Sequence, residues 1–274
     1  MLKMNKYLLS VSLALISLHT LAEGYMNENM VIFSSSSDGS NTPWQANPKC
    51  TPVIQKASTT QTWSVQYNYP DGSPLTSRFL TTAKPSMKAA ECEHLVHFPD
   101  NIQSSGTFES FYPDGKLRSR IPYTDGIYNG KLTFWFASGL KEQESTLRNG
   151  VSDGEYRIWH PNGQLALSMG YKDDAQHGMK QRWYEDSQPW TYVRFENGQM
   201  QGELKQWFRN GQMERQGEYR KGQRHGTYKA WYDDGTPQAV LNYQTGKIIS
   251  AQCWNEMNKP VSAKQCIDWF KDEE

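Results

Sequence analysis

The residues most able to support chemistry lie between Glu91 and His97, where the chain reads Glu-Cys-Glu-His-Leu-Val-His. On a helix, His94 and His97 would share one face at a spacing that can hold a metal ion. Zinc sites usually need three or four ligands, and this segment offers no third ligand of suitable geometry. The preferred interpretation is a solvated amphipathic helix with Cys92 in a disulfide and no metal.

Catalytic motifs are absent from the sequence: Gly-x-Ser-x-Gly, His-Glu-x-x-His, Cys-x-x-Cys and phosphate-binding glycine loops do not occur. His160 stands in a column of aromatic residues and is interpreted as a packed ring. His177 and His225 each precede a glycine beside a turn, where exposed polar residues are expected. Because no set of nucleophile, base and orienting group is found, we expect a protein that is not an enzyme, with no catalytic residue, metal or cofactor.

Glycines recur every 24 residues from Gly106 to Gly226, with Ser250 at the next place, and they mark the strands and turns that must position the other side chains. A period of this size predicts a repeat array. Six units follow: 107–130, 131–154, 155–178, 179–202, 203–226 and 227–250. Counted from each glycine, position nine is again glycine in all but one unit, where Ser187 replaces it.

Each unit reads as two short strands and two turns. Pro113-Asp114-Gly115 supplies a fixed φ, a side chain that bonds its own backbone and a residue free to take positive φ. This composition predicts a type I turn followed by a glycine bulge. Asp125-Gly126 marks the second turn. Since one hairpin is marginally stable alone, neighbouring units are expected to stack into an elongated antiparallel β-sheet.

Two aromatic columns run through the units. Position five carries Phe111 and then the expected repeat core, Trp135, Trp159, Trp183, Trp207 and Trp231. Position six carries His160 and a candidate binding stripe, Tyr112, Phe136, Tyr184, Phe208 and Tyr232. Adjacent strand positions point to opposite sides of a sheet, so the tryptophans are expected to be buried between hairpins, and the stripe to lie on the other side. An exposed stripe would bind a protein or a glycan, but caps or sheet curvature would also be able to cover it.

The repeated unit resembles the bacterial variant of the MORN repeat: two aromatics, two residues and Gly, then an aromatic, Asn/Asp-Gly and a further Gly. The resemblance covers 107–250. It implies an elongated, twisted antiparallel sheet used for contacts with proteins and sometimes lipid, with no catalytic residues. Similar bacterial proteins are often labelled antitoxin-like.

The ends of the chain differ from the repeats. Residues 1–22 have the three parts of a signal peptide: Lys3 and Lys6, an apolar stretch from Tyr7 to Leu18, and Thr20-Leu21-Ala22. We expect a flexible segment over 23–62, including the serine-rich linker 34–41. An N-terminal cap is expected over 63–106, with a diverged hairpin at Tyr69-Pro70-Asp71-Gly72 and a helix over 85–96. A C-terminal helical cap over 251–274 would contain a helix at about 261–270.

The four cysteines, Cys50, Cys92, Cys253 and Cys266, lie outside the repeats. In an exported chain an even number indicates disulfides, and four cysteines allow three pairings. The simplest pairing is Cys50–Cys92 and Cys253–Cys266, each clamping one cap. Export to a periplasm or to the medium is therefore expected.

Charge and composition narrow the partners. Without Lys3 and Lys6, the 29 basic residues become 27, against 29 acidic ones, which argues against nucleic acid and against a polybasic membrane patch. No later apolar run is long enough to span a membrane. Two functions compete: an exported scaffold for protein–protein interaction in the cell envelope, antitoxin- or immunity-like as a special case, and a module that binds peptidoglycan or another glycan.

Overall fold

The structure is a computed structural model that describes residues 48–56, 62–95, 102 and 104–270 of the 274-residue chain. The expected signal peptide, the serine-rich linker and His97 lie outside the described residues. The fold class is the one expected, mainly β with a long antiparallel sheet of stacked hairpins and one short C-terminal helix.

The N-terminal part forms a sheet of four described strands in the order β3-β2-β1-β4. Its elements are β1 (Lys49–Lys56), β2 (Trp63–Asn68), β3 (Phe79–Thr81), β4 (Ala90–Glu91) and the 3-10 turn η1 (Cys92–Leu95). Two expectations are corrected here. Part of the segment expected to be flexible forms strand β1, which pairs with β2. The helix expected over 85–96 is replaced by β4 and η1, because β4 pairs with β1 and Cys92 is bonded to Cys50.

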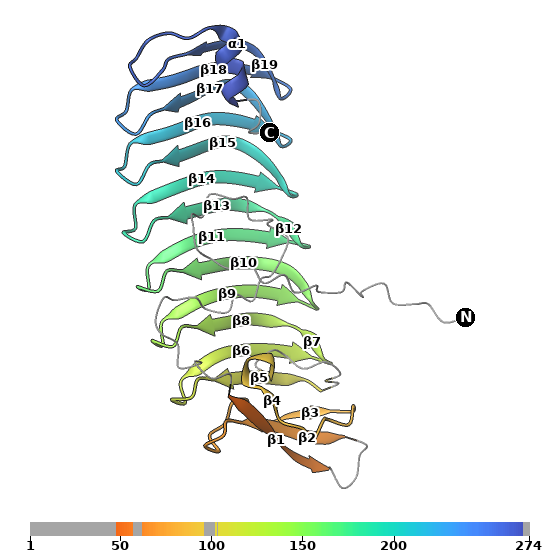
Figure 1. Cartoon of the computed structure of the whole chain (residues 1–274). Helices are drawn as coiled ribbons and strands as arrows, with labels where there is room; N and C mark the ends of the chain where they lie inside the picture. Colours follow the sequence, from red (N-terminus) through yellow and green to blue (C-terminus); the bar gives the residue numbers. More distant parts are fainter. Residues whose placement is uncertain (1–47, 57–61, 96–101, 103, 271–274) are drawn as a thin grey trace, which may run out of the picture. The chain divides into compact units, whose positions relative to one another are not determined.

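The repeats form the second sheet, whose strands follow one another in chain order from β5 to β19 (Figure 1). The strands are β5 (Gly106–Phe111), β6 (Leu117–Thr124), β7 (Ile127–Tyr128), β8 (Gly130–Trp135), β9 (Lys141–Arg148), β10 (Val151–Trp159), β11 (Leu165–Lys172), β12 (Ala175–Gln176), β13 (Gly178–Trp183), β14 (Pro189–Glu196), β15 (Gln199–Trp207), β16 (Met213–Arg220), β17 (Gln223–Trp231), β18 (Pro237–Gln244) and β19 (Lys247–Cys253). Short β7 and β12 pair only with β6 and β11 among the described strands.

The turns explain why this sequence folds as hairpins. In the first turn, Gly115 has φ +81°, and the Asp114 carboxylate accepts a hydrogen bond from the Lys116 backbone N–H at 3.1 Å. In the second turn, Asp125 and Gly126 both have positive φ, 49° and 75°. Two consecutive residues of positive φ are the requirement of a type I′ hairpin turn, which Asp-Gly and Asn-Gly satisfy.

The two faces of the large sheet are different. One, the core face, carries the buried alternate side chains, such as Phe108, Leu132 and Leu241. Its buried residues gather in one cluster around Phe108 and Leu132 and another around Tyr228 and Leu241. The opposite face, the indole face, carries the position-five tryptophans. In each repeat hairpin the register shifts between positions four and five, next to the first turn. This β-bulge leaves one extra residue in the returning strand, so the side chains at positions twelve and thirteen both lie on the core face.

Helix α1 (Ala263–Phe270) covers the C-terminal end of the core face. Phe270 packs edge-to-face on Tyr228 with ring centroids 6.4 Å apart, and the Cys253–Cys266 disulfide joins α1 to β19. Together with Cys50–Cys92, this is the simplest of the three pairings expected from the sequence. None of the described helices is long and apolar enough to cross a membrane.

Candidate functional site

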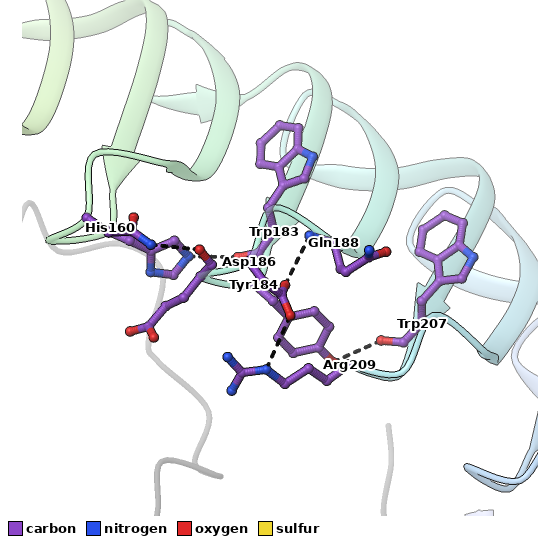
Figure 2. A network of polar contacts seen from close by, with 9 residues as sticks. His160, Trp183, Tyr184, Asp186, Gln188, Trp207 and Arg209 are labelled. Atoms are coloured by element: carbon purple, nitrogen blue, oxygen red, sulfur yellow. Dashed lines mark hydrogen bonds and ion pairs between the residues drawn. The ribbon is translucent and has the colours of Figure 1, made fainter.

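The position-six rings form a ladder along the sheet, and every one except Phe136 and Phe208 hydrogen-bonds to the following hairpin or to the cap. Tyr112 Oη donates to the Trp135 carbonyl at 2.7 Å, and Tyr184 Oη donates to the Trp207 carbonyl at 2.9 Å. His160 Nε2 makes the equivalent contact to the Trp183 carbonyl at 3.0 Å (Figure 2). We call this set the ring ladder; with both ends, its members are Tyr69, Tyr112, Phe136, His160, Tyr184, Phe208 and Tyr232.

The ring ladder extends beyond the six units. Tyr69 Oη donates to the Phe111 carbonyl at 2.8 Å, and Tyr232 Oη donates to the Trp254 carbonyl at 2.9 Å. The turn after Tyr69 has the same bonds as the repeat turns, with Gly72 at φ +88°. The rings therefore link the N-terminal hairpin, the repeats and the start of the C-terminal cap.

Polar side chains reinforce the same edge of the sheet. Asp186 accepts a hydrogen bond from the Gln188 backbone N–H at 3.1 Å and lies 3.6 Å from Arg209 of the next hairpin (Figure 2). Asn162 and Asn210 each donate from Nδ2 to a backbone carbonyl of the following turn, at 2.7 and 2.6 Å. This edge is a structural framework whose polar groups are directed at neighbouring turns.

The exposure of the two columns differs from the expectation. The stripe residues Tyr112 and Phe136 are buried, each only 6% exposed, and Tyr184, Phe208 and Tyr232 are half-buried on the core side of the sheet. None of the five tryptophans belongs to the buried core of the described residues; all are half-buried on the indole face. In Figure 2 the indoles of Trp183 and Trp207 project to the side opposite the Tyr184 ring. In units three to six both aromatic columns are therefore half-buried, and they differ in the face of the sheet on which they lie.

From the third unit onward, each position-five tryptophan lies directly opposite an apolar residue of its hairpin partner strand. The register pairs Trp159 with Leu165, and Trp183 with Pro189. Trp207 and Trp231 face Met213 and Pro237 in the same way. In the C-terminal cap, Trp254 forms an isolated bridge with Pro260. We define the indole track as Trp159, Leu165, Trp183, Pro189, Trp207, Met213, Trp231, Pro237 and Trp254.

The track does not extend into the second unit, 131–154. There, the partner of Trp135 is Lys141, whose ammonium group forms an ion pair with Glu144 at 2.6 Å and lies 5.5 Å from the Trp159 ring centroid. Arg120 lies over the Trp135 ring at 6.0 Å. Trp135 therefore occupies the same place in its repeat as the track indoles but faces a lysine instead of an apolar partner.

A row of polar side chains follows the track on the same face, two residues earlier along each strand. In units three to six these residues are Arg157, Gln181, Lys205 and Lys229. Arg157 pairs with Glu155 at 2.6 Å, and Lys205 pairs with Glu203 at 2.8 Å. Hydrogen bonds from Lys205 and Gln216 hold the pKa of Glu203 below its ordinary value, so this carboxylate stays ionised.

A hollow of about 500 Å³ lies beside this row over β15, β16 and β17. Its lining residues are Gly202, Glu203, Gln216, Gly217, Glu218, Thr227 and Lys229. Glycine is required at position 217, because a Cβ there would lie 2.4 Å from the Cδ2 atom of Tyr228. The hollow lies on the indole face.

No group of three or more metal-ligating side chains occurs within the described part of the chain. His94 and His97 were the sequence candidates, but the side chain of the first and all of the second fall outside what is described. Sequence reasoning missed the apolar partners of the indoles and the role of Trp254, because both depend on strand register.

The comparisons identify the repeats. The model of the MORN repeat variant family matches residues 105–125, 152–173, 200–221 and 224–253, which fall at four of the repeat positions. Curated proteins include no significant match to the chain. Repeats of this family commonly mediate protein or membrane interactions, and they are typically non-catalytic. Four segments of this sheet are therefore similar in sequence to the MORN repeat variant, and each forms part of the stack of hairpins.

Proposed function

We propose that the mature chain is an exported, non-enzymatic repeat scaffold that binds a partner protein in the cell envelope, with an antitoxin- or immunity-like role as a special case. The observation that carries this proposal is the indole track, in which a half-buried tryptophan faces an apolar partner in each of four successive units on one face of the sheet. Surface strips of this kind are typical of interaction sites. The N-terminal pattern supports export, and the two disulfides suggest a non-reducing compartment.

Affinity capture from the envelope tests the scaffold. The mature protein is compared with the double variant Leu165→Asp, Met213→Asp, which places two charges in the track. We expect the wild type to retain one stoichiometric protein that the double variant loses, while the core-side variant Phe208→Tyr retains it. A wild type that retains no protein, or a partner held equally by the double variant, would contradict the proposal.

Glycan binding is the second candidate, because tryptophan rings at regular spacing are also suited to stacking on sugar rings. Co-sedimentation of the mature protein with purified sacculi tests it. A protein that stays in the supernatant removes this candidate.

A further inference from the structure

The indole track has a definite period. Neighbouring strands lie about 4.8 Å apart, so the track indoles, one per hairpin, recur about every 9.6 Å across the sheet. From Trp159 to Trp254 the sheet passes from β10 to β19. These are eight strand spacings, a track length of about 38 Å. A partner that uses the whole track must present an apolar group at nearly the same interval.

The common backbone conformations differ in this interval. A polyproline II helix has three residues per turn and a rise of about 3.1 Å, so equivalent groups recur about every 9.3 Å. An extended strand presents side chains to one face about every 6.8 Å, which does not match. Two turns of α-helix advance about 10.8 Å, and over four intervals that mismatch grows to about 5 Å, a whole strand spacing. Over the same distance the polyproline II mismatch is about 1 Å.

The chemistry of the surface supports the same conformation. Proline rings of a polyproline II helix dock on aromatic-lined surfaces, and the fixed φ of proline lowers the entropy lost on binding. The backbone carbonyls of such a peptide have no internal hydrogen bonds and need donors. Beside the track, Arg157, Gln181, Lys205 and Lys229 supply one donor-bearing side chain in each of four successive units.

We propose that the indole track binds a proline-rich segment of the partner protein in polyproline II conformation, lying across the strands with an apolar residue at every third position. A segment of about thirteen residues contains twelve rises, about 37 Å, which matches the four intervals of the track. This inference rests on the proposed scaffold function, since it names the part of the partner that the scaffold recognises.

Oligoprolines of three, six, nine and twelve residues are the probe, titrated into the mature protein with tryptophan fluorescence and calorimetry as readouts. Affinity is expected to rise with each added triplet, because each triplet reaches one more indole. Trp183→Ala and Trp207→Ala are each expected to weaken binding of the longest peptide about tenfold or more, as buried aromatic anchors do. A length-matched Gly-Ser peptide is expected not to bind.

Trp135→Ala is the matched control, because Trp135 has the same place in its repeat but lies outside the track; we expect less than a twofold change. Pro189→Glu and Met213→Glu keep every indole and are expected to weaken binding, which guards against loss of fold in the alanine variants. Oligoproline that fails to bind, affinity that does not depend on length, or equal losses in Trp135→Ala would overturn the inference. So would Trp-dependent binding of sugar oligomers without binding of oligoproline.

Competition separates this inference from the scaffold function. If an envelope protein is captured through the track but the twelve-residue oligoproline does not displace it, the scaffold function stands and the polyproline inference fails. If the peptide displaces the captured protein, both stand.

Discussion

Removing one hydroxyl from the ring ladder tests whether the ladder holds the stack together. In Tyr184→Phe the ring stays, but the 2.9 Å hydrogen bond to the Trp207 carbonyl is lost. A hydrogen bond of this kind contributes about 1 kcal/mol net, and the site is half-buried, so we expect a loss of about 0.5–1 kcal/mol. For a chain of this size that loss lowers the melting temperature by about 1–4 °C. Thermal and urea unfolding followed by circular dichroism, with both disulfides intact, measure the change.

The chain supplies its own reverse experiment. Phe208 occupies the next place on the ladder and has no hydroxyl, so Phe208→Tyr can donate to the Trp231 carbonyl as its neighbours do. We expect this variant to melt at or above the wild-type temperature, and the double variant to lie near the wild type, since the two bonds are separate. An unchanged midpoint for Tyr184→Phe, together with a clear loss for Phe208→Tyr, would refute the view that the hydroxyl contacts stabilise the stack.

Three further predictions concern the backbone, the caps and pH. Gly178→Ala is expected to lower the free energy of unfolding by about 1–2 kcal/mol, because the backbone has a φ of +92° at this residue. Gly154→Ala is expected to lower it further, because the new Cβ would also lie 2.8 Å from Thr146 Cβ. Equal urea midpoints for the two variants would contradict this prediction. Loop-closure entropy predicts that Cys253→Ser with Cys266→Ser lowers the free energy of unfolding by about 3 kcal/mol, and that Cys50→Ser with Cys92→Ser lowers it by about 4 kcal/mol. Calorimetry measures both losses, and a smaller loss for the longer Cys50–Cys92 loop would contradict the entropic explanation. Burial, with smaller contributions from Tyr171 and Glu142, raises the pKa of Tyr156 from 10.0 to about 12. The corresponding contribution to the free energy of unfolding, about 2–3 kcal/mol, is fully present below pH 10 and is lost as the pH rises towards 12. Tyr156→Phe should therefore reduce the fall of the urea midpoint at alkaline pH. An unchanged slope would show that Tyr156 ionises equally in the folded and the unfolded state.

The sequence by itself determined the local structure of the repeats. Glycine at a fixed interval, Asp or Asn before it and alternating apolar residues act within one hairpin, so their pattern predicts turns, strands and stacking without knowledge of distant contacts. Of the three cysteine pairings that the sequence left open, the simplest one, with each pair at its own end of the chain, is the one that the structure contains. The helix expected over 85–96 was wrong, because pairing of β4 with β1 overrides local propensity there.

Only the tertiary structure decided where each aromatic column is covered. Strand alternation puts positions five and six on opposite sides, but it does not say which side is covered. Packing of α1 on Tyr228 and of the N-terminal Phe79 on Phe108, whose rings are 5.7 Å apart, covers the two ends of the side that carries the ring ladder. The register of the returning strands then sets Leu165, Pro189, Met213 and Pro237 opposite the tryptophans. These contacts join residues of different strands and of the caps, and a periodic sequence does not encode them locally.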